Sequence, residues 1–218
     1  MFRGAGCSEP AKPSLRPPKV DGDLDRFPRF ALKVDRTLWR VVRDDHHPWW
    51  FSSSMEGRFD LPPPDGTGYV ASDDLGALLE RLGPGLAPGG IAPSSLLAGR
   101  HLRALHVPRP HVLADSLARR ATRWLTSEIS TITPYHVPQA WARAFRGQGF
   151  MGIRYGIRHS TWRRHFSVAI FGPSGERNWR KGRQVPISES VHRRLRETHG
   201  IVLFDIPSAD ELVFAPGE

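Results

Sequence analysis

Residues 68–83, GYVASDDLGALLERLG, predict a short strand followed at once by an amphipathic helix. The strand residues are 69–71, and residues 72–74 (Ser-Asp-Asp) supply an N-cap and negative charge at the positive end of the helix dipole. Gly83 ends the helix, whose apolar positions recur at helical spacing: Leu75, Leu78, Leu79 and Leu82. This stripe faces the core, so Glu80 at its flank can reach into a cleft beside the core.

On either side of this unit, short strands and short helices are mixed. The 20 prolines and 21 glycines favour many turns and short helices. We expect further strands at 38–42, 101–107, 150–155, 166–171 and 201–204, and further helices at 115–124, 137–145 and 188–199. The order has no βαβ rhythm, so the fold class is α+β with a mixed sheet and short flanking helices, not a doubly wound parallel sheet.

Domain organisation follows from length and from the distribution of proline. A chain of 218 residues is long enough for one domain and too short for two comfortable ones. Residues 1–28 are rich in proline and poor in apolar side chains, so we expect a disordered or loosely docked leader. Residues 29–218 are expected to form a single domain.

The composition excludes several classes of protein. No run of eighteen apolar residues occurs and nothing resembles a secretory signal, so we expect no membrane span. Cys7 is the only cysteine, which excludes internal disulfides and cysteine-rich zinc sites and favours a cytoplasmic location. The oligomeric state is not predicted.

The net charge of +9 is concentrated in one segment. Residues 151–200 hold eleven basic and three acidic residues, a balance of +8. Such a segment attracts polyanions, and Trp162 and Trp179 among its arginines can stack on bases, so nucleic acid is one possible partner. The alternatives are the phosphates of a nucleotide, or a solvated surface in a chain that prefers arginine throughout.

Familiar catalytic patterns are missing. No dinucleotide-binding glycine fingerprint, no phosphate-binding Gly-Lys-Ser/Thr and no Gly-x-Ser-x-Gly occurs. His101, His106 and His111 are five residues apart, a spacing that matches neither one helix face nor one side of a strand. We therefore expect no metal site.

An ordered series of polar and aromatic residues remains. It comprises Arg40 in a strand, Gly57-Arg58-Phe59 in a loop, Tyr69 at a strand entry and Glu80 on the following helix. Each one alone is most simply a surface or core residue. Together they suit a dinucleotide, because arginines bind diphosphates, a tyrosine ring stacks on nicotinamide, and a carboxylate stabilises the positive charge that develops on ribose when its bond to nicotinamide breaks.

This series resembles the RES domain, a family named for an arginine, a glutamate and a serine. The resemblance runs over roughly residues 36–172, with residues 201–204 as a closing strand. The motifs that carry it are Leu38-Trp39-Arg40-Val41, Gly57-Arg58-Phe59-Asp60, Gly68-Tyr69-Val70-Ala71, Ala77-Leu78-Leu79-Glu80, Gln139-Ala140-Trp141-Ala142 and Gly152-Ile153-Arg154-Tyr155.

The resemblance implies a fold similar to the ADP-ribosyltransferases and a toxin that consumes NAD by phosphorolysis, hydrolysis or protein ADP-ribosylation. It also implies an Xre-type antitoxin as partner. Arg40 and Glu80 match the family arginine and glutamate, which gives Arg40, Tyr69 and Glu80 as catalytic residues, and the residues expected to bind NAD are Gly57, Arg58, Phe59 and Ser160.

The serine expected after Gly156 is replaced by Ile157. Either Ser160 takes its place through a shifted loop, or the site lacks one ligand contact. The second possibility leaves open a RES domain that binds NAD or a partner without catalysis, in which case serine at position 157 would create or raise activity.

Overall fold

The computed structural model describes residues 14–19, 23–160 and 165–205. Its centre is an eight-stranded sheet with the order β1-β7-β8-β9-β4-β2-β6-β11, in which β7 and β8 run parallel and the other neighbours antiparallel. The predicted α+β class with a mixed sheet is confirmed. The bounds of these strands are β1 Arg29–Leu32, β2 Leu38–Arg43, β4 Asp65–Ala71, β6 Arg100–Leu105, β7 His111–Asp115, β8 Gly152–Gly156, β9 Phe166–Pro173 and β11 Lys181–Pro186.

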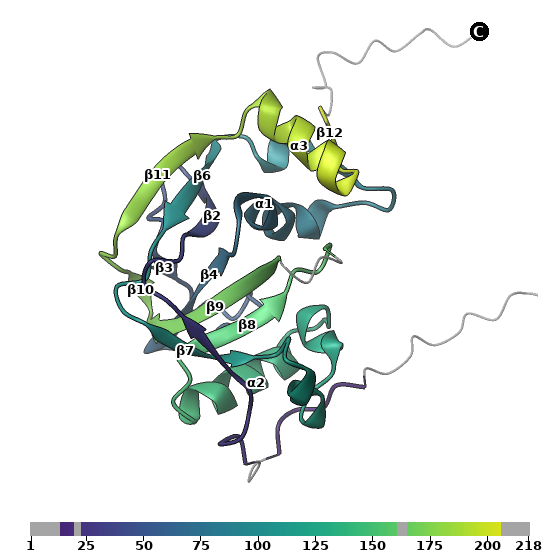
Figure 1. Ribbon diagram of the computed structural model, residues 1–218. Helices are drawn as coiled ribbons and strands as arrows, with labels where there is room; N and C mark the ends of the chain where they lie inside the picture. Colours follow the sequence, from purple (N-terminus) through teal and green to yellow (C-terminus); the bar gives the residue numbers. More distant parts are fainter. Residues whose placement is uncertain (1–13, 20–22, 161–164, 206–218) are drawn as a thin grey trace, which may run out of the picture.

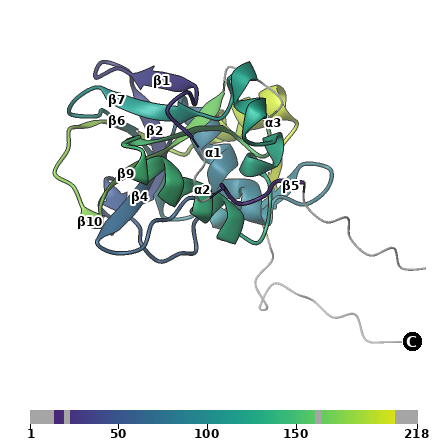
Figure 2. The same ribbon diagram turned by 90° about the horizontal axis from the view of Figure 1, so that it is seen from below.

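Three helices pack on one face of this sheet, in two groups. Helices α1 (Asp74–Leu82) and α3 (Glu189–His199) lie toward one end and α2 (His136–Gly147) toward the other (Figure 1). Seen from below, α2 is nearest the viewer, with α1 and α3 behind it (Figure 2). Two small sheets complete the described chain: β3 (Trp50–Phe51) pairs with β10 (Gly175–Glu176), and β5 (Ile91–Pro93) pairs with β12 (Val202–Phe204). Short 3-10 turns cover Gly83–Gly85, Ser94–Leu96, Arg119–Arg123 and Ser127–Ser130.

The core has three parts that follow this arrangement. Under α1 and α3, the four leucines of α1 are buried with Trp39, Ala71 and Leu102 of the sheet. Under α2, the buried side chains include Phe145, Ile153 and Tyr155. The opposite face of the sheet is covered by Trp49 and Phe51, with Trp179 packed against them. The two helix groups thus pack on separate parts of one sheet face, and each has its own core cluster.

Capping residues and apolar spacing in the sequence predict the positions of three helices correctly. The carboxylate of Asp73 accepts a hydrogen bond from Gly76 N at 2.8 Å, which caps α1 as predicted. The predicted helices at 137–145 and 188–199 are also confirmed, and α3 ends at Gly200, whose φ of 67° suits glycine.

The predicted helix at 115–124 is wrong. Residues 111–115 form β7, and only residues 119–123 form a 3-10 turn. Pairing accounts only for the start of this segment, because Asp115 ends β7, which lies between β1 and β8 and bonds to both. The Asp115 carboxylate is also held by Arg154 of β8, 3.0 Å away.

The leader is docked where the structure describes it. Residues 1–13 and 20–22, with Cys7, lie outside the described residues, but Leu15, Leu24 and Phe27 are buried in the core under α2. Two tryptophan indoles, of Trp124 and Trp141, donate to main-chain carbonyls of the leader at 3.0 and 2.9 Å. Residues 14–19 and 23–28 are therefore docked on the core, one of the two states expected for the leader.

Within the described residues, no helix is both long and apolar enough to cross a membrane.

Candidate active site

A pocket of about 270 Å³ lies on the sheet face between the two helix groups. Its floor is one row of residues directly opposite one another on four strands: Trp39 of β2, Ala71 of β4, Ser167 of β9 and Tyr155 of β8. Opposed residues on neighbouring strands point to the same face, so antiparallel register alone brings these four together. Within the described residues, β2 and β4 pair only at Trp39 and Ala71, and the pocket opens where these two strands diverge.

Glu80 extends from α1 to the floor of the pocket. Its Oε1 accepts a hydrogen bond from the Ser167 hydroxyl at 2.9 Å. The side chain is open to the space of the pocket, yet protein surrounds its carboxylate on most sides, and this loss of hydration raises the pKa of Glu80. The Ser167 hydroxyl and the cations Arg58 and Arg158 oppose that rise. Glu80 is therefore a partly dehydrated carboxyl group whose charged form is stabilised by two nearby arginines.

Arg58 enters the pocket on a loop that is fixed by the buried carboxylate of Asp60. Asp60 accepts hydrogen bonds from Tyr69 Oη at 2.8 Å and from Gly57 N at 3.0 Å, and also from the hydroxyls of Ser52 and Ser54. Tyr69 Oη in turn accepts from Phe59 N at 2.8 Å. These bonds tie the loop to β4 and leave the Arg58 side chain lining the pocket.

Gly57 is required by the same contacts. A Cβ on Gly57 would lie 2.3 Å from Asp60 Oδ1 and 2.6 Å from Tyr69 Oη. A larger residue must therefore break the bonds that position Arg58.

Tyr69 lines the pocket with its ring while its hydroxyl is committed to Asp60 and Phe59. Burial, followed by the Asp60 carboxylate, raises the pKa of Tyr69 well above its ordinary value. The phenol therefore stays protonated at any working pH. Tyr69 is suited to stack its ring on a ligand and is not suited to act as an acid.

Arg40 also lines the pocket. Its Nη1 donates to the carbonyls of Pro48 and Trp50, at 2.9 and 3.0 Å, which holds the segment before β3 against β2. Burial lowers the pKa of Arg40 to about 10, so the guanidinium keeps its charge at neutral pH. It contributes both a fixed positive charge and a structural tie.

Five of the seven predicted site residues meet in this pocket: Arg40, Gly57, Arg58, Tyr69 and Glu80. Phe59 does not line it, because its ring is buried against Tyr155, 4.8 Å between centroids, and only its backbone serves the site. Ser160 does not line it either; its amide donates to Ile157 O at 3.1 Å.

Ile157 is a core residue. It is buried with Leu75 and Leu78 of α1, and its Cδ1 lies 2.8 Å from where a Cβ on Gly76 would be. An isoleucine at this position therefore packs α1 onto the sheet and takes no ligand contact away from the pocket.

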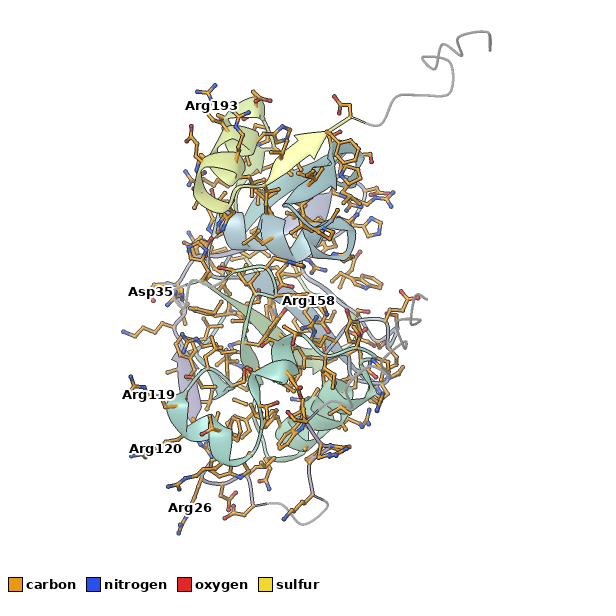
Figure 3. The ribbon with its side chains drawn as sticks, turned by 90° about the vertical axis from the view of Figure 1, so that its right-hand side faces the viewer. Arg26, Asp35, Arg119, Arg120, Arg158 and Arg193 are labelled. Atoms are coloured by element: carbon orange, nitrogen blue, oxygen red, sulfur yellow. The ribbon has the colours of Figure 1, made fainter. Side chains whose placement is uncertain are left out.

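Sequence reasoning missed four residues around the carboxylate. Ser167, Tyr155 and Tyr135 line the pocket, and Arg158 acts on Glu80 through its charge. Figure 3 shows Arg158 at mid-height, between the part of the molecule with α3 and the part that carries Arg119. A signal for Ser167 exists, because it is the one polar residue in the apolar strand stretch 166–171.

Two other expectations concern the remaining surface. Among the described residues, no group of three His, Cys, Asp or Glu side chains is placed to hold a metal ion. Trp179 packs edge-on against Trp49 and Phe51, at 4.9 and 5.3 Å, so its ring is engaged in the core; Trp162 lies outside the described residues.

Comparison with known proteins agrees with this fold. No curated protein sequence matches the chain. A solved structure, described as the crystal structure of the M. tuberculosis MbcT–MbcA toxin–antitoxin complex, contains a chain with a TM-score of 0.59 and 15% identity, over 77% of this chain and 92% of that one. The model of the RES domain family matches residues 37–192. Since this match spans more than half of the sequence and includes the whole pocket floor, the chain belongs to the RES domain family.

Proposed function

We propose that this protein consumes NAD by cleaving the bond between nicotinamide and ribose. The observation that carries the proposal is the convergence of a partly dehydrated carboxylate, three arginines and three tyrosine rings in one small pocket. Arg58 supplies charge for a diphosphate, and Tyr69 and Tyr155 supply ring surface for a nicotinamide.

The proposed step needs no metal. As the C1′–N bond breaks, its electron pair goes to the ring nitrogen and neutralises the pyridinium, so nicotinamide leaves uncharged. Positive charge then develops on the ribose, where the Glu80 carboxylate stabilises it. Phosphate, water or a protein side chain completes the reaction by forming a bond to C1′, and the attacking group loses its proton.

Ser167 holds Glu80 in place by the 2.9 Å hydrogen bond to Oε1. That bond favours the charged carboxylate over the acid and limits rotation of its side chain. The alternative, a RES domain without catalysis, rests on the missing serine at position 157, and the serine beside Glu80 supports the catalytic proposal over it.

The test is incubation of the purified protein with NAD, with and without phosphate, while NAD loss and nicotinamide release are followed. Glu80→Gln should lower the rate of NAD loss by a factor of about 10²–10³. Glu197→Gln, at an exposed position on α3, is the matched control and should behave as wild type. Equal turnover in Glu80→Gln and wild type, or no NAD loss under either condition and none after a cell lysate is added as a source of protein acceptors, would overturn the proposal. A requirement for phosphate would assign phosphorolysis.

We further propose that the protein is the toxin of a toxin–antitoxin pair, with an Xre-type antitoxin as partner. The similar chain comes from a toxin–antitoxin complex, and the family match supports the same role. Expression should then arrest growth, and co-expression of the antitoxin or the Glu80→Gln change should relieve the arrest. If growth arrest persists with Glu80→Gln, the toxicity does not depend on the Glu80 carboxylate of this pocket.

A further inference from the structure

A second cavity adjoins the pocket. It has a volume of about 440 Å³ and shares the side chains of Glu56 and Tyr135 with the first one. Its other lining residues are Met55 of the loop between β3 and β4, Thr133 and Pro134 of the loop before α2, and His136 and Gln139 of the first turns of α2.

The first pocket is too small for a whole dinucleotide. Its volume of about 270 Å³ lies below the range of about 300–1000 Å³ that small-molecule sites usually occupy. Since Glu80 and Ser167 are in that pocket, the nicotinamide and its ribose must lie there for the proposed reaction to occur. The rest of the dinucleotide needs a neighbouring space.

Arg58 stands at the boundary between the two cavities. It lines the first, and its guanidinium carbon is 5.3 Å from the centre of the Tyr135 ring, which lines both. This contact holds the cation over the shared wall. A diphosphate bound to Arg58 would therefore have one nucleoside on each side.

The lining of the second cavity suits a nucleoside better than a phosphate. It contains no arginine or lysine, and it has the apolar surfaces of Met55, Pro134 and the Tyr135 ring for a base. Glu56 offers a carboxylate, which accepts hydrogen bonds from the two ribose hydroxyls and repels a phosphate. Gln139 fixes the shape of the cavity, because its Nε2 donates to Met55 O and Gly57 O at 2.8 and 3.0 Å.

We propose that this second cavity binds the adenosine half of NAD, with Arg58 on the diphosphate between the two cavities. The proposal rests on the proposed function of the first pocket. It assigns a binding place to the part of NAD that the first pocket does not hold. It makes the site selective for a dinucleotide over nicotinamide mononucleotide, which lacks the adenosine.

The test fills the second cavity without touching the first. His136 is exposed, begins α2 and lines only the second cavity, so His136→Trp places a large side chain there. Arg143→Trp, also exposed on α2 but lining neither pocket, is the control. The quantity measured is kcat/KM for NAD divided by kcat/KM for nicotinamide mononucleotide.

His136→Trp should lower that ratio by about tenfold or more, and Arg143→Trp should leave it unchanged. A ratio that is the same in His136→Trp as in wild type would overturn the proposal while leaving NAD cleavage standing.

A binding measurement separates this proposal from the reaction. ADP-ribose, which has no nicotinamide to release, should bind to wild type, and His136→Trp should raise its Kd about tenfold by calorimetry. If NAD is not cleaved but this selective loss of affinity is seen, the second cavity still binds adenosine and only the proposed reaction fails. If wild type binds neither ADP-ribose nor NAD, both proposals fail.

Discussion

Ser167 and Glu80, 87 residues apart in the chain, are joined by a 2.9 Å hydrogen bond at the floor of the pocket. The bond links β9 of the central sheet to α1 above it. It connects the one polar side chain of an otherwise apolar strand stretch to the one carboxylate at the flank of a leucine stripe. Their pairing holds the Glu80 carboxylate at the floor of the pocket.

Ser167→Ala should shift the acid limb of the activity profile. The hydroxyl favours the charged form of Glu80, so its removal raises the pKa of Glu80 further. In the proposed reaction Glu80 acts as a carboxylate, so activity should be lost at a higher pH than in wild type, with a loss of kcat/KM of about tenfold at neutral pH. Ser95→Ala, at an exposed position outside the pocket, is the control and should match wild type. A fall in activity with an unshifted pH profile would contradict this role for Ser167.

Glu80→Gln should make the protein more stable at neutral pH. The pKa of Glu80 is raised in the folded state above its ordinary value of 4.5, so ionisation of this group opposes folding. The contribution of protonated Glu80 to the free energy of unfolding is fully present below pH 4.5. It is lost as the pH rises through the pKa of Glu80 in the folded state. Tm measured from pH 4 to pH 8 should show the variant above wild type at the upper end and the two converging at the lower end. A Tm of Glu80→Gln below that of wild type at pH 8 would contradict the prediction that ionisation of Glu80 opposes folding.

Ile157→Ser should destabilise the protein without raising its activity. The side chain fills the core beneath α1, and its loss leaves a cavity with a buried hydroxyl, a cost of about 2–5 kcal/mol. Denaturant unfolding followed by circular dichroism gives the free energy of unfolding. Higher NAD turnover in this variant would show that position 157 is in fact a ligand position. Ile157→Val, which keeps an apolar side chain, should cost about 0.5–1.5 kcal/mol.

Gly57→Ala should disable the site while leaving the core intact. The added methyl group must displace Asp60 or Tyr69, and the loop that carries Arg58 moves with them. A displacement of about 1 Å at a reacting centre costs about 100-fold in rate. Gly147→Ala is a suitable control, because a Cβ there meets nothing within 4 Å. Full activity of Gly57→Ala would show that the position of Arg58 does not depend on these bonds.

The leader should contribute measurably to stability. Phe27 is buried against Phe145, 4.7 Å between ring centroids, and against Trp124 at 5.4 Å. Phe27→Ala should lower the free energy of unfolding by about 3–5 kcal/mol in denaturant titrations. Lys33→Ala, at an exposed position just beyond the same segment, should change it little. If the two variants unfold alike, the leader does not pack in solution as it does here.

The sequence by itself determined those features whose signals are local. The N-cap at Asp73, the leucine stripe of α1 and the stop at Gly83 lie within a dozen residues, and helical hydrogen bonds connect neighbours in the chain. The same holds for α2 and α3 and for the strand at 38–42. The ordered series Arg40, Gly57, Arg58, Tyr69 and Glu80 was also visible from sequence, because it lies in one short stretch that a strand, a loop and a helix fold into one wall of the pocket.

The tertiary structure alone decided the rest. Strand register placed Ser167 beside Ala71 and Tyr155, and no local pattern encodes which residues of distant strands stand opposite one another. Pairing with β1 and β8 made Asp115, the first residue of the predicted helix at 115–124, the last residue of a strand, and only residues 119–123 of that segment form a 3-10 turn. Packing of α1 made Ile157 a core residue, because burial depends on what the rest of the chain brings to that point and not on the sequence around it.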